Sequence, residues 1–577
     1  MNNKLKINVT FFLFLSYIIF ILINDYLCFI FKTNYDILLY IISLIIYFLL
    51  YFILRKKIEL IKDRFCRIDI LFIIIILGIW LARLPIPDSS FDTLNYHLYL
   101  QERLFSNNVN FNFFPARWIN TFSFPLGDRL HFLFRTIFGY RLGMISNIFC
   151  MIVIYFQTKI ILSKFIKKVY YIPIFSILIL LTEQLCTNMI TYYVDLFSIP
   201  LFLEIIIVLL YAKKTDNKTN YLVLLLSGIL ISLKISNAFF IIILGIIYII
   251  KNKDSINIKT FLIGIPIVIL PIFIYMVNNY IQTGNPVFPF YNSIFESKYL
   301  PNSNWIETAY GPKTLIERIL WPIIILKYPR RAFDTDIYYG RIGFGFIISL
   351  LFILFQIKNY KKSNEFKLSI LYVIMCLIWS NFMMGYIRYA LILEIISGII
   401  SVLFVYNYFK SKNNIIFITS LLVLISLGHV FYNTLSDIFK SSTELSWRNP
   451  YSLNKEDYKK NIRYVMDRPK KYDKYTSNID CFGIVDYNSG YAALLSKKAK
   501  IININEGYNS AYGERKFNKI INECKNTYTV STSSNLERTE KYLKAANYER
   551  NGENIEFKTD FLNINSEIIL FEITKVN

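Results

Sequence analysis

The stretch PIPDSSFDTLNYH, residues 85–97, follows an apolar run that ends near residue 84. Its two prolines end the preceding helix sharply, because proline lacks a backbone donor and restricts the residue before it. Ser89 or Ser90 is then placed to cap a new helix whose apolar positions suit a membrane interface. Two carboxylates, a histidine and aromatic residues gather here beside a membrane face. We therefore predict that the loop over residues 85–136 is the functional centre of the chain.

The rest of the chain has the composition of a membrane protein. Its 577 residues are 55% hydrophobic and 17% aromatic, and about 20 apolar residues suffice to cross a bilayer. The first run lacks a small-residue cleavage site and another run follows at once, so we treat it as retained. We predict a polytopic α-helical membrane protein with about 13 transmembrane helices, near residues 8–31, 36–54, 68–84, 138–157, 170–186, 195–212, 221–233, 236–250, 259–280, 342–357, 368–386, 389–408 and 414–432.

The positive charge marks the orientation of the chain. The formal net charge is +23, but Lys and Arg cluster in alternate loops, which argues against nucleic acid as a partner. The positive-inside rule places these loops and the N-terminus in the cytoplasm. The remaining loops and the C-terminal tail then lie on the outer face of the cytoplasmic membrane.

Three domains follow from this pattern. Residues 1–67 form a transmembrane hairpin with a basic cytoplasmic loop, and residues 68–432 form a transmembrane catalytic module with outer loops at 85–136 and 281–341. Residues 433–577 turn polar and alternate short strands with helices, which predicts an extracytoplasmic α/β domain with a parallel sheet. Only Cys481 and Cys524, of seven cysteines, lie in this tail, and their spacing leaves a disulfide open.

Asp92 is the first candidate for a chemical role. With Asp88 it lies on one face of a helix, where a carboxylate can act as a general base on an acceptor hydroxyl. The alternative is that Asp simply favours a helix N-terminus. Asp195 lies at the start of a later apolar run, and its alternative is again that Asp favours a helix N-terminus. Glu204 lies within a span, where an acid is either functional or neutral and hydrogen-bonded.

Four cations at the outer face are candidates for binding phosphate: Lys234, Arg330, Arg331 and Arg388. Arg binds phosphate through paired hydrogen bonds, although each cation can instead extend to lipid headgroups. Lys234 also lies where two short apolar runs meet, which predicts a broken hairpin around a cavity. Tyr96 and His97 follow Asp92 by four and five positions. The alternative for His97 is a packed helix residue, and the alternative for Tyr96 is an aromatic of the interfacial belt.

The order of these segments resembles the C-type (GT-C) superfamily of membrane glycosyltransferases. That superfamily includes protein O-mannosyltransferases, lipid A aminoarabinose transferases and bacterial families grouped as RgtA/B/C/D-like or family-39-like. FDTLNYHL, residues 91–98, resembles its acidic motif, and FPLGD, residues 124–128, the stretch that follows. Four further stretches resemble later segments of that superfamily: YVD (193–195), LK (233–234), GNPVFP (284–289) and RY (388–389). The resemblance covers about residues 68–410. The sequence departs from it after Arg388-Tyr389, where prolines are usual, and in its extra N-terminal hairpin.

The resemblance implies an inverting transferase that moves a sugar from a polyprenyl-phosphate donor to a glycan, lipid or protein acceptor. Asp92 would be the base, and Asp88, Tyr96, His97 and Asp195 would bind the acceptor or the sugar. Lys234, Arg330, Arg331 and Arg388 would bind the lipid phosphate. Besides the donor and acceptor, membrane lipid is an expected partner. We assign no cofactor and leave a divalent metal open.

Three other functions remain at this point. A polymerase or ligase of lipid-linked glycans fits the basic segment 318–341, but such a protein is not expected to carry the early Asp-Tyr-His loop. A transporter would carry polar residues in several spans and internal repeats, but this sequence has few of the former and no informative repeat. The third is a non-catalytic protein that retains the superfamily fold.

Overall fold

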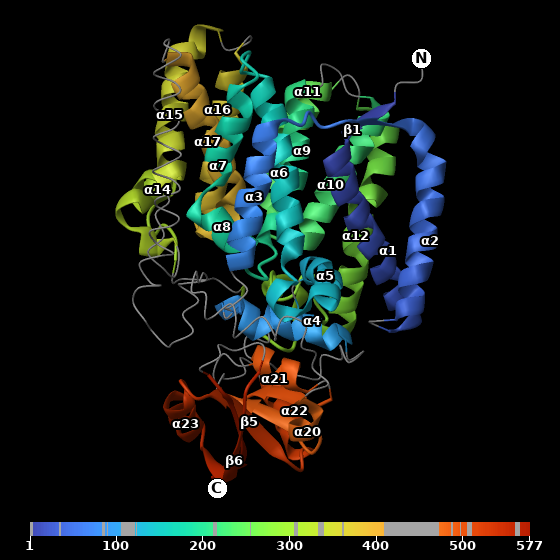
Figure 1. Ribbon diagram of the computed structural model, residues 1–577, viewed down its shortest axis with the longest axis vertical. Coiled ribbons are helices and arrows are strands. Elements are labelled where there is room, and N and C mark those ends of the chain that lie inside the picture. Colours follow the sequence, from blue (N-terminus) through green and yellow to red (C-terminus); the bar gives the residue numbers. More distant parts are fainter. Residues whose placement is uncertain are drawn as a thin grey trace.

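The computed structural model describes residues 4–33, 36–82, 87–88, 90–105, 122, 124–211, 216–253, 256–304, 310–332, 340–359, 363–408, 472–485, 489–496, 498–504, 511–559 and 566–576. Figure 1 shows a bundle of apolar helices with helix α4 lying across one end and a small α/β domain beyond it. The N-terminus lies at the far end of the bundle, and the C-terminus lies in the α/β domain. The two termini are therefore at opposite ends of the molecule.

The helices of the bundle follow the predicted apolar runs, except α14 (Leu315–Lys327), which lies within the stretch predicted as the outer loop 281–341. Six are long and apolar enough to cross a membrane, or seven if the bent pair α7–α8 is one span, counted over the described residues alone. The helices are α1 (Val9–Phe31), α2 (Ile37–Leu54), α3 (Arg67–Ala82), α6 (Ile145–Ser163), α7 (Tyr171–Leu180), α8 (Glu183–Met189), α9 (Ser198–Tyr211), α10 (Asn217–Leu233), α11 (Asn237–Asn252), α12 (Ile258–Thr283), α14 (Leu315–Lys327), α15 (Gly340–Gln356), α16 (Asn364–Phe382) and α17 (Leu391–Tyr408). The chain is thus a multi-pass membrane protein. The count of about 13 spans is not confirmed, and the run at 414–432 lies outside the described residues.

Polar caps and breakers set the ends of these helices. Asp216 and Asn257 accept hydrogen bonds from backbone N–H groups in the first turns of α10 and α12, which satisfies donors that a helix start leaves free. The predicted span at 170–186 is instead broken, because α7 and α8 meet at 75°. Arg341 donates to the carbonyls of Leu178 and Ile179 at the end of α7, at 2.9 Å each.

Helices α4 and α5 lie outside the spans at the end nearest the α/β domain, as does the short helix α13 (Asn292–Phe295) of the third outer loop. The helix predicted from Ser90 onward is present as the π-helical segment η2 (Thr93–His97) followed by α4 (Leu98–Phe105). Helix α5 (Leu126–Leu142) was expected to run on into the fourth span. That expectation is wrong, because Gly139 has a φ of 74° inside α5 and the span begins again at Ile145.

The extra N-terminal hairpin is fastened to the bundle by buried polar groups. Asp25 of α1 pairs with Arg129 of α5 at 2.8 Å, and the Tyr275 hydroxyl of α12 donates to the same carboxylate. Both charged side chains are less than 10% exposed. Beyond the opposite end of the hairpin, strand β1 (Leu5–Asn8) pairs in parallel with β2 (Ile58–Ile61).

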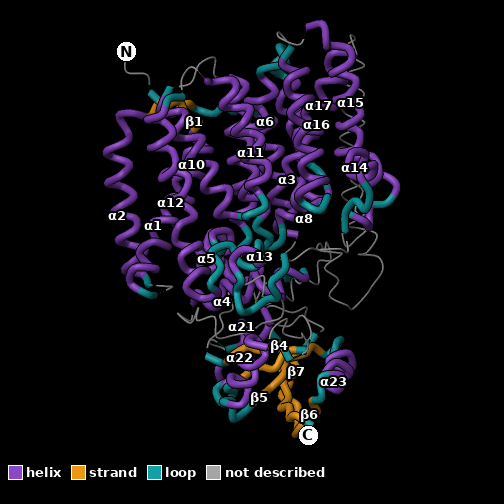
Figure 2. The backbone as a smooth tube through the Cα atoms, turned by 180° about the vertical axis from the view of Figure 1, so that it is seen from behind, coloured by secondary structure: helices purple, strands orange, loops and turns teal. Residues whose placement is uncertain are grey.

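The C-terminal domain is a five-stranded sheet in the order β4-β3-β5-β7-β6 with helices against it, shown from behind in Figure 2. The prediction of a parallel sheet holds for β3–β4 and β3–β5, but β7 pairs antiparallel with both β5 and β6. The elements are α20 (Asp473–Thr476), β3 (Cys481–Ile484), α21 (Ser489–Leu495), β4 (Lys500–Asn503), α22 (Ala511–Asn522), β5 (Thr527–Thr532), α23 (Leu536–Ala545), β6 (Tyr548–Phe557) and β7 (Ile568–Lys575). Strand β6 was not predicted.

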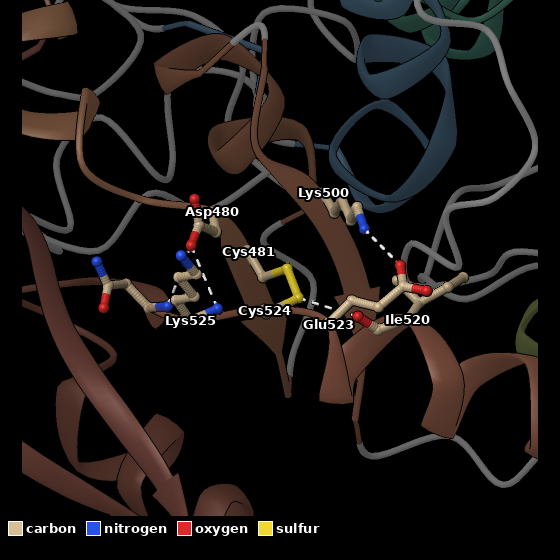
Figure 3. The surroundings of a disulfide bond; sticks show 8 residues. Asp480, Cys481, Lys500, Ile520, Glu523, Cys524 and Lys525 are labelled. Atoms are coloured by element: carbon tan, nitrogen blue, oxygen red, sulfur yellow. Dashed lines mark hydrogen bonds and ion pairs between the residues drawn. A yellow bond between two sulfur atoms is a disulfide. The ribbon is translucent and has the colours of Figure 1, made fainter.

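A disulfide joins Cys481, at the start of β3, to Cys524, just after α22. Figure 3 shows Asp480 beside it, accepting hydrogen bonds from the backbone after Cys524, and the ion pair between Lys500 and Glu523 at 3.0 Å. Disulfides persist in oxidising compartments. The bond therefore supports the predicted location of this domain outside the cytoplasm.

The α/β domain is docked on the bundle through two contacts. Phe288, Tyr299 and Leu300 of the third outer loop share a small hydrophobic core with Ile502 and Ile520 of the domain. Helix α21 packs on η2 and α4, with Gly490 at the point of closest approach. A β-carbon on Gly490 would lie 2.9 Å from the carbonyl oxygen of Leu94. The domain thus rests directly on the helix that begins beside Asp92.

Candidate active site at the outer end of the bundle

Asp88 builds the local structure that presents Asp92. It is 1% exposed, and its carboxylate accepts hydrogen bonds from the Ser90 N–H at 2.9 Å and the Thr93 hydroxyl at 2.7 Å. It also accepts the Tyr192 N–H at 2.8 Å. These bonds start the helix at Ser90 and fasten it to the second outer loop. Asp88 therefore has a structural position, outside the charge cluster described next.

Four of the predicted residues meet in one ion-pair network. Arg388 pairs with Asp92 through Nη1, and its Nε lies 3.5 Å from Asp195 Oδ2. Lys234 Nζ lies 2.5 Å from the other oxygen of Asp195. The side chains of Asp195 and Arg388 are 4% and 8% exposed, and Asp92 and Lys234 are more open, at 16% and 23%. The charges of two acids and two cations thus balance one another. Asp92 and Lys234, the two more exposed members, lie at the edge of the network.

Each member comes from a different element, and each sits at the end of that element. Asp195 begins the 3₁₀ turn η4 (Asp195–Phe197) ahead of α9, as predicted for the outer end of that span. Lys234 follows α10 at its turn into α11, which confirms the predicted break. Arg388 lies in the 3₁₀ turn η8 (Ile387–Ala390) before α17. The network therefore forms where these helices begin or end.

Aromatic rings support the two cations. The Arg388 guanidinium lies 4.2 Å from the centre of the Tyr193 ring, and Lys234 Nζ lies 4.0 Å from the centre of the Tyr389 ring. Cation–π contacts of this kind hold a cation in place without neutralising it. Tyr193 and Tyr389 were not among the predicted site residues, although each is a near neighbour of one in the sequence.

The network lies in a recess of the bundle. Helices α10 and α12 begin side by side, because Thr260 Oγ1 lies 3.3 Å from Asn217 Oδ1. Gly228 lets them pack closely, since its β-carbon position is only 2.3 Å from the Val268 carbonyl oxygen. Helix α10 has 17 residues and α12 has 26, so at 1.5 Å per residue Lys234 lies about 14 Å short of the end of α12. A pocket of about 10 Å³, room for about one water, lies beside Lys234 and Arg388.

Burial and charge act in opposite directions on Asp92. Burial raises the pKa of this carboxyl, but the charge of the Arg388 guanidinium outweighs burial and holds the pKa below its usual value. Asp92 is therefore ionised at neutral pH. A carboxylate tied to Arg388 is a weak base, and it becomes a stronger one only when that cation is drawn away.

His97 is not itself a member of the network. Its Nδ1 is 2.9 Å from Asp128 Oδ1, and Gln101 donates to the same oxygen at 3.3 Å. Its ring lies 4.2 Å from that of Tyr96, measured between centres. Tyr96 is also buried, and it is a hydrogen-bond partner of Asp92. Asp128, the last residue of the FPLGD stretch (124–128), thus orients His97, which is a predicted site residue.

Arg330 and Arg331 are not part of the network. They lie in the 3₁₀ turn η6 (Pro329–Arg331), where Arg331 makes two hydrogen bonds to Glu317, at 2.9 and 2.6 Å. Arg331 also lies over the Trp321 ring. The turn is linked to the site through the backbone, because Ile387 N–H donates to the Ala332 carbonyl at 3.0 Å. Among the described residues no group of three or more His, Cys, Asp or Glu side chains is placed to hold a metal ion.

The fold and the site together define a multi-pass helical membrane protein with a recessed acid–base charge network under an α/β domain. Residues 131–395 match a family described as a domain of unknown function, DUF8201. No curated protein matches the chain.

Solved structures provide three similarities. The first is with ArnT from Cupriavidus metallidurans bound to undecaprenyl phosphate, at a TM-score of 0.47 and 10% identity over 87% of this chain and 97% of that one. The second is with ArnT from the same organism in the apo state, at a TM-score of 0.47 and 9% identity over 87% of this chain and 97% of that one. The third is with the apo oligosaccharyltransferase from Archaeoglobus fulgidus, at a TM-score of 0.41 and 12% identity over 80% of this chain and 69% of that one.

Proposed function

We propose that this chain is an integral membrane glycosyltransferase that moves a sugar from a polyprenyl-phosphate donor to an acceptor on the outer face of the membrane. The observation that supports this most directly is the sharing of Arg388 between Asp92 and Asp195 in a recess of the bundle. A recessed carboxylate beside two cations can serve both halves of such a transfer. The cations suit the leaving phosphate, and the carboxylate suits the proton of the acceptor hydroxyl.

The donor phosphate would compete with Asp92 for Arg388. Arg binds phosphate oxygens through paired hydrogen bonds, more strongly than it binds one carboxylate oxygen. As Arg388 turns to the phosphate, Asp92 loses the charge that keeps its pKa low and becomes a better proton acceptor. Lys234, held by Asp195 and Tyr389, would add the second positive charge. Donor binding would thereby activate the base.

The transfer then needs one carboxylate. Asp92 accepts the proton of the acceptor hydroxyl, whose oxygen attacks the anomeric carbon from the face opposite the phosphate. The bond to the phosphate oxygen breaks, the lipid phosphate leaves, and the configuration at that carbon inverts. Tyr96 and His97 belong to the segment η2, on which helix α21 of the α/β domain packs, and we place the acceptor beside this segment. Asp88, Arg330 and Arg331 have no direct part in this scheme.

The test uses membranes that contain the full chain and labelled polyprenyl-phosphate sugars. The rate at which the lipid-linked label is consumed should be about 10²-fold lower or more in Asp92→Asn, as expected for removal of a general base. Glu296→Gln is the control, because Glu296 is an exposed carboxylate of the third outer loop outside the network. Asp92→Asn protein that inserts normally and keeps full transfer activity would refute the assignment of the base.

A further inference from the structure

A second cavity lies at the end of the bundle opposite the α/β domain. It has a volume of about 1900 Å³ and is bounded by strands β1 and β2, the loop after β2, and helices α6, α7, α9 and α10. This is the end at which the N-terminus lies in Figure 1. The charge network at the other end shares no residue with it. The cavity is therefore a separate site.

Unpaired positive charge gathers around this cavity. Seven cations and four acids line it. Lys159 is fixed by Asp69, at 2.8 and 2.7 Å from its two oxygens. Within the described part of the chain the other six cations make no ion pair; they are Lys4, Lys6, Lys62, Arg64, Arg67 and Lys167.

The acids do not neutralise these cations. Asp216 caps α10 through the Thr219 N–H, and Asp63 accepts the Thr10 N–H at 3.0 Å. Glu204 accepts from Gln157 at 3.0 Å. These three acids thus stabilise the walls, whereas the fourth, Glu59, lies opposite Lys6 in the register of β1 and β2. Because cations outnumber acids in the lining, an excess of positive charge remains available to an anion.

The deeper walls and the rim are apolar. Ile207, Val208 and Leu222 line the cavity from α9 and α10. Phe65 and Val169 also line it, and they are 58% and 61% exposed. Large apolar side chains in a membrane protein can contact lipid without the cost that they carry in water, so a rim of this kind suits contact with lipid chains. A purely aqueous anion site would not need such a rim.

We propose that this cavity binds the phosphate head of an anionic lipid, with its chains along the apolar wall. Arg64 and Arg67 provide planar donors for phosphate oxygens, and Lys62 adds a mobile charge beside them. The shared chemistry is a phosphate carrying long apolar chains. An anionic glycerophospholipid and a polyprenyl phosphate both have it. The proposal is independent of the transferase reaction.

The experiment measures lipid retained by the full chain after purification in detergent, by native mass spectrometry. The variant Lys62→Gln/Arg64→Gln/Arg67→Gln is compared with Arg55→Gln/Lys56→Gln/Lys57→Gln. The control removes the same charge from the same loop but at residues that do not line the cavity. Each basic residue near an anionic surface contributes about fivefold to binding. Because three cations are removed, we expect a loss on the order of 10²-fold in the Lys62→Gln/Arg64→Gln/Arg67→Gln variant and no comparable loss in the control. Lys4, Lys6 and Lys167 remain in both.

Three added probes distinguish the source of the anion: phosphatidylglycerol, a polyprenyl phosphate and inorganic phosphate. Phosphatidylcholine is the uncharged reference. Charge-dependent retention of either anionic lipid supports the proposal and identifies which source fits. Equal retention by both triple variants refutes it. Displacement of the lipid by inorganic phosphate at similar concentration also refutes it, because the site would then recognise a soluble anion.

Discussion

Removing Arg388 should unbalance the charge network, and a second substitution should restore the balance. Asp92, Asp195, Lys234 and Arg388 sum to zero charge. Arg388→Met leaves one negative charge in excess in a site whose two acids are 16% and 4% exposed. Asp92→Asn added to Arg388→Met brings the sum back to zero. The double variant should therefore be more stable than the single one.

The structure indicates the size of both effects. Removing one partner of a buried ion pair costs about 3–5 kcal/mol, because the other charge stays buried and unpaired. Here Lys234 still faces Asp195, so we expect about 3 kcal/mol for Arg388→Met. Neutralising Asp92 should recover about 2 kcal/mol of that loss. The remaining loss of about 1 kcal/mol corresponds to the lost contact of Arg388 with the Tyr193 ring.

Unfolding of the purified protein in detergent, followed by tryptophan fluorescence against denaturant, measures these differences. Arg331→Met is the matched control, because Arg331 and Glu317 are 30% and 25% exposed and such a pair contributes about 1 kcal/mol or less. Transfer activity should be absent in both Arg388 variants, since the proposed phosphate ligand is gone. The reasoning is refuted if the double variant is no more stable than Arg388→Met, or if Arg331→Met costs as much.

Three further changes test other parts of the structure. Asp88→Ala should destabilise the protein by about 2–4 kcal/mol, measured by the same unfolding assay, because buried donors lose their acceptor; an unchanged stability would contradict its structural role. Gly490→Val should loosen the α/β domain, because its side chain would collide with the Leu94 backbone; faster proteolysis between the two parts of the chain reports this, and an unchanged pattern argues against the docking. Cys481→Ala/Cys524→Ala should cost about 2–4 kcal/mol through the freed loop, seen as lost resistance of the domain to protease; no difference from wild type under non-reducing conditions would show that the bond is not formed.

The sequence predicted those features that neighbouring residues determine. The helix from Ser90 and the break at Lys234 follow from prolines, caps and short apolar runs, and both are present. Strand β6 was missed because only its end residues, Tyr548 and Phe557, are buried, so it has no alternating pattern. Gly139, which separates α5 from the next span, gave no signal beyond being a glycine in an apolar run.

The partners of the site residues could not be predicted in the same way. Asp92 and Arg388 are 296 positions apart, and nothing local to either one selects the other. The spacing of Asp88 and Asp92 suggested a shared role, whereas the Tyr192 N–H, 104 positions from Asp88, gives Asp88 a different one. Arg331 was grouped with Arg388 by charge, but Glu317 holds it elsewhere.

The wide spacing of the charge network also bears on how the protein is made. Synthesis delivers Asp92 first, then Asp195, then Lys234, and Arg388 only after two thirds of the chain has been completed. Until α17 inserts, the outer end of the nascent bundle carries one uncompensated negative charge. Chains that stop before residue 388 keep that charge in the network.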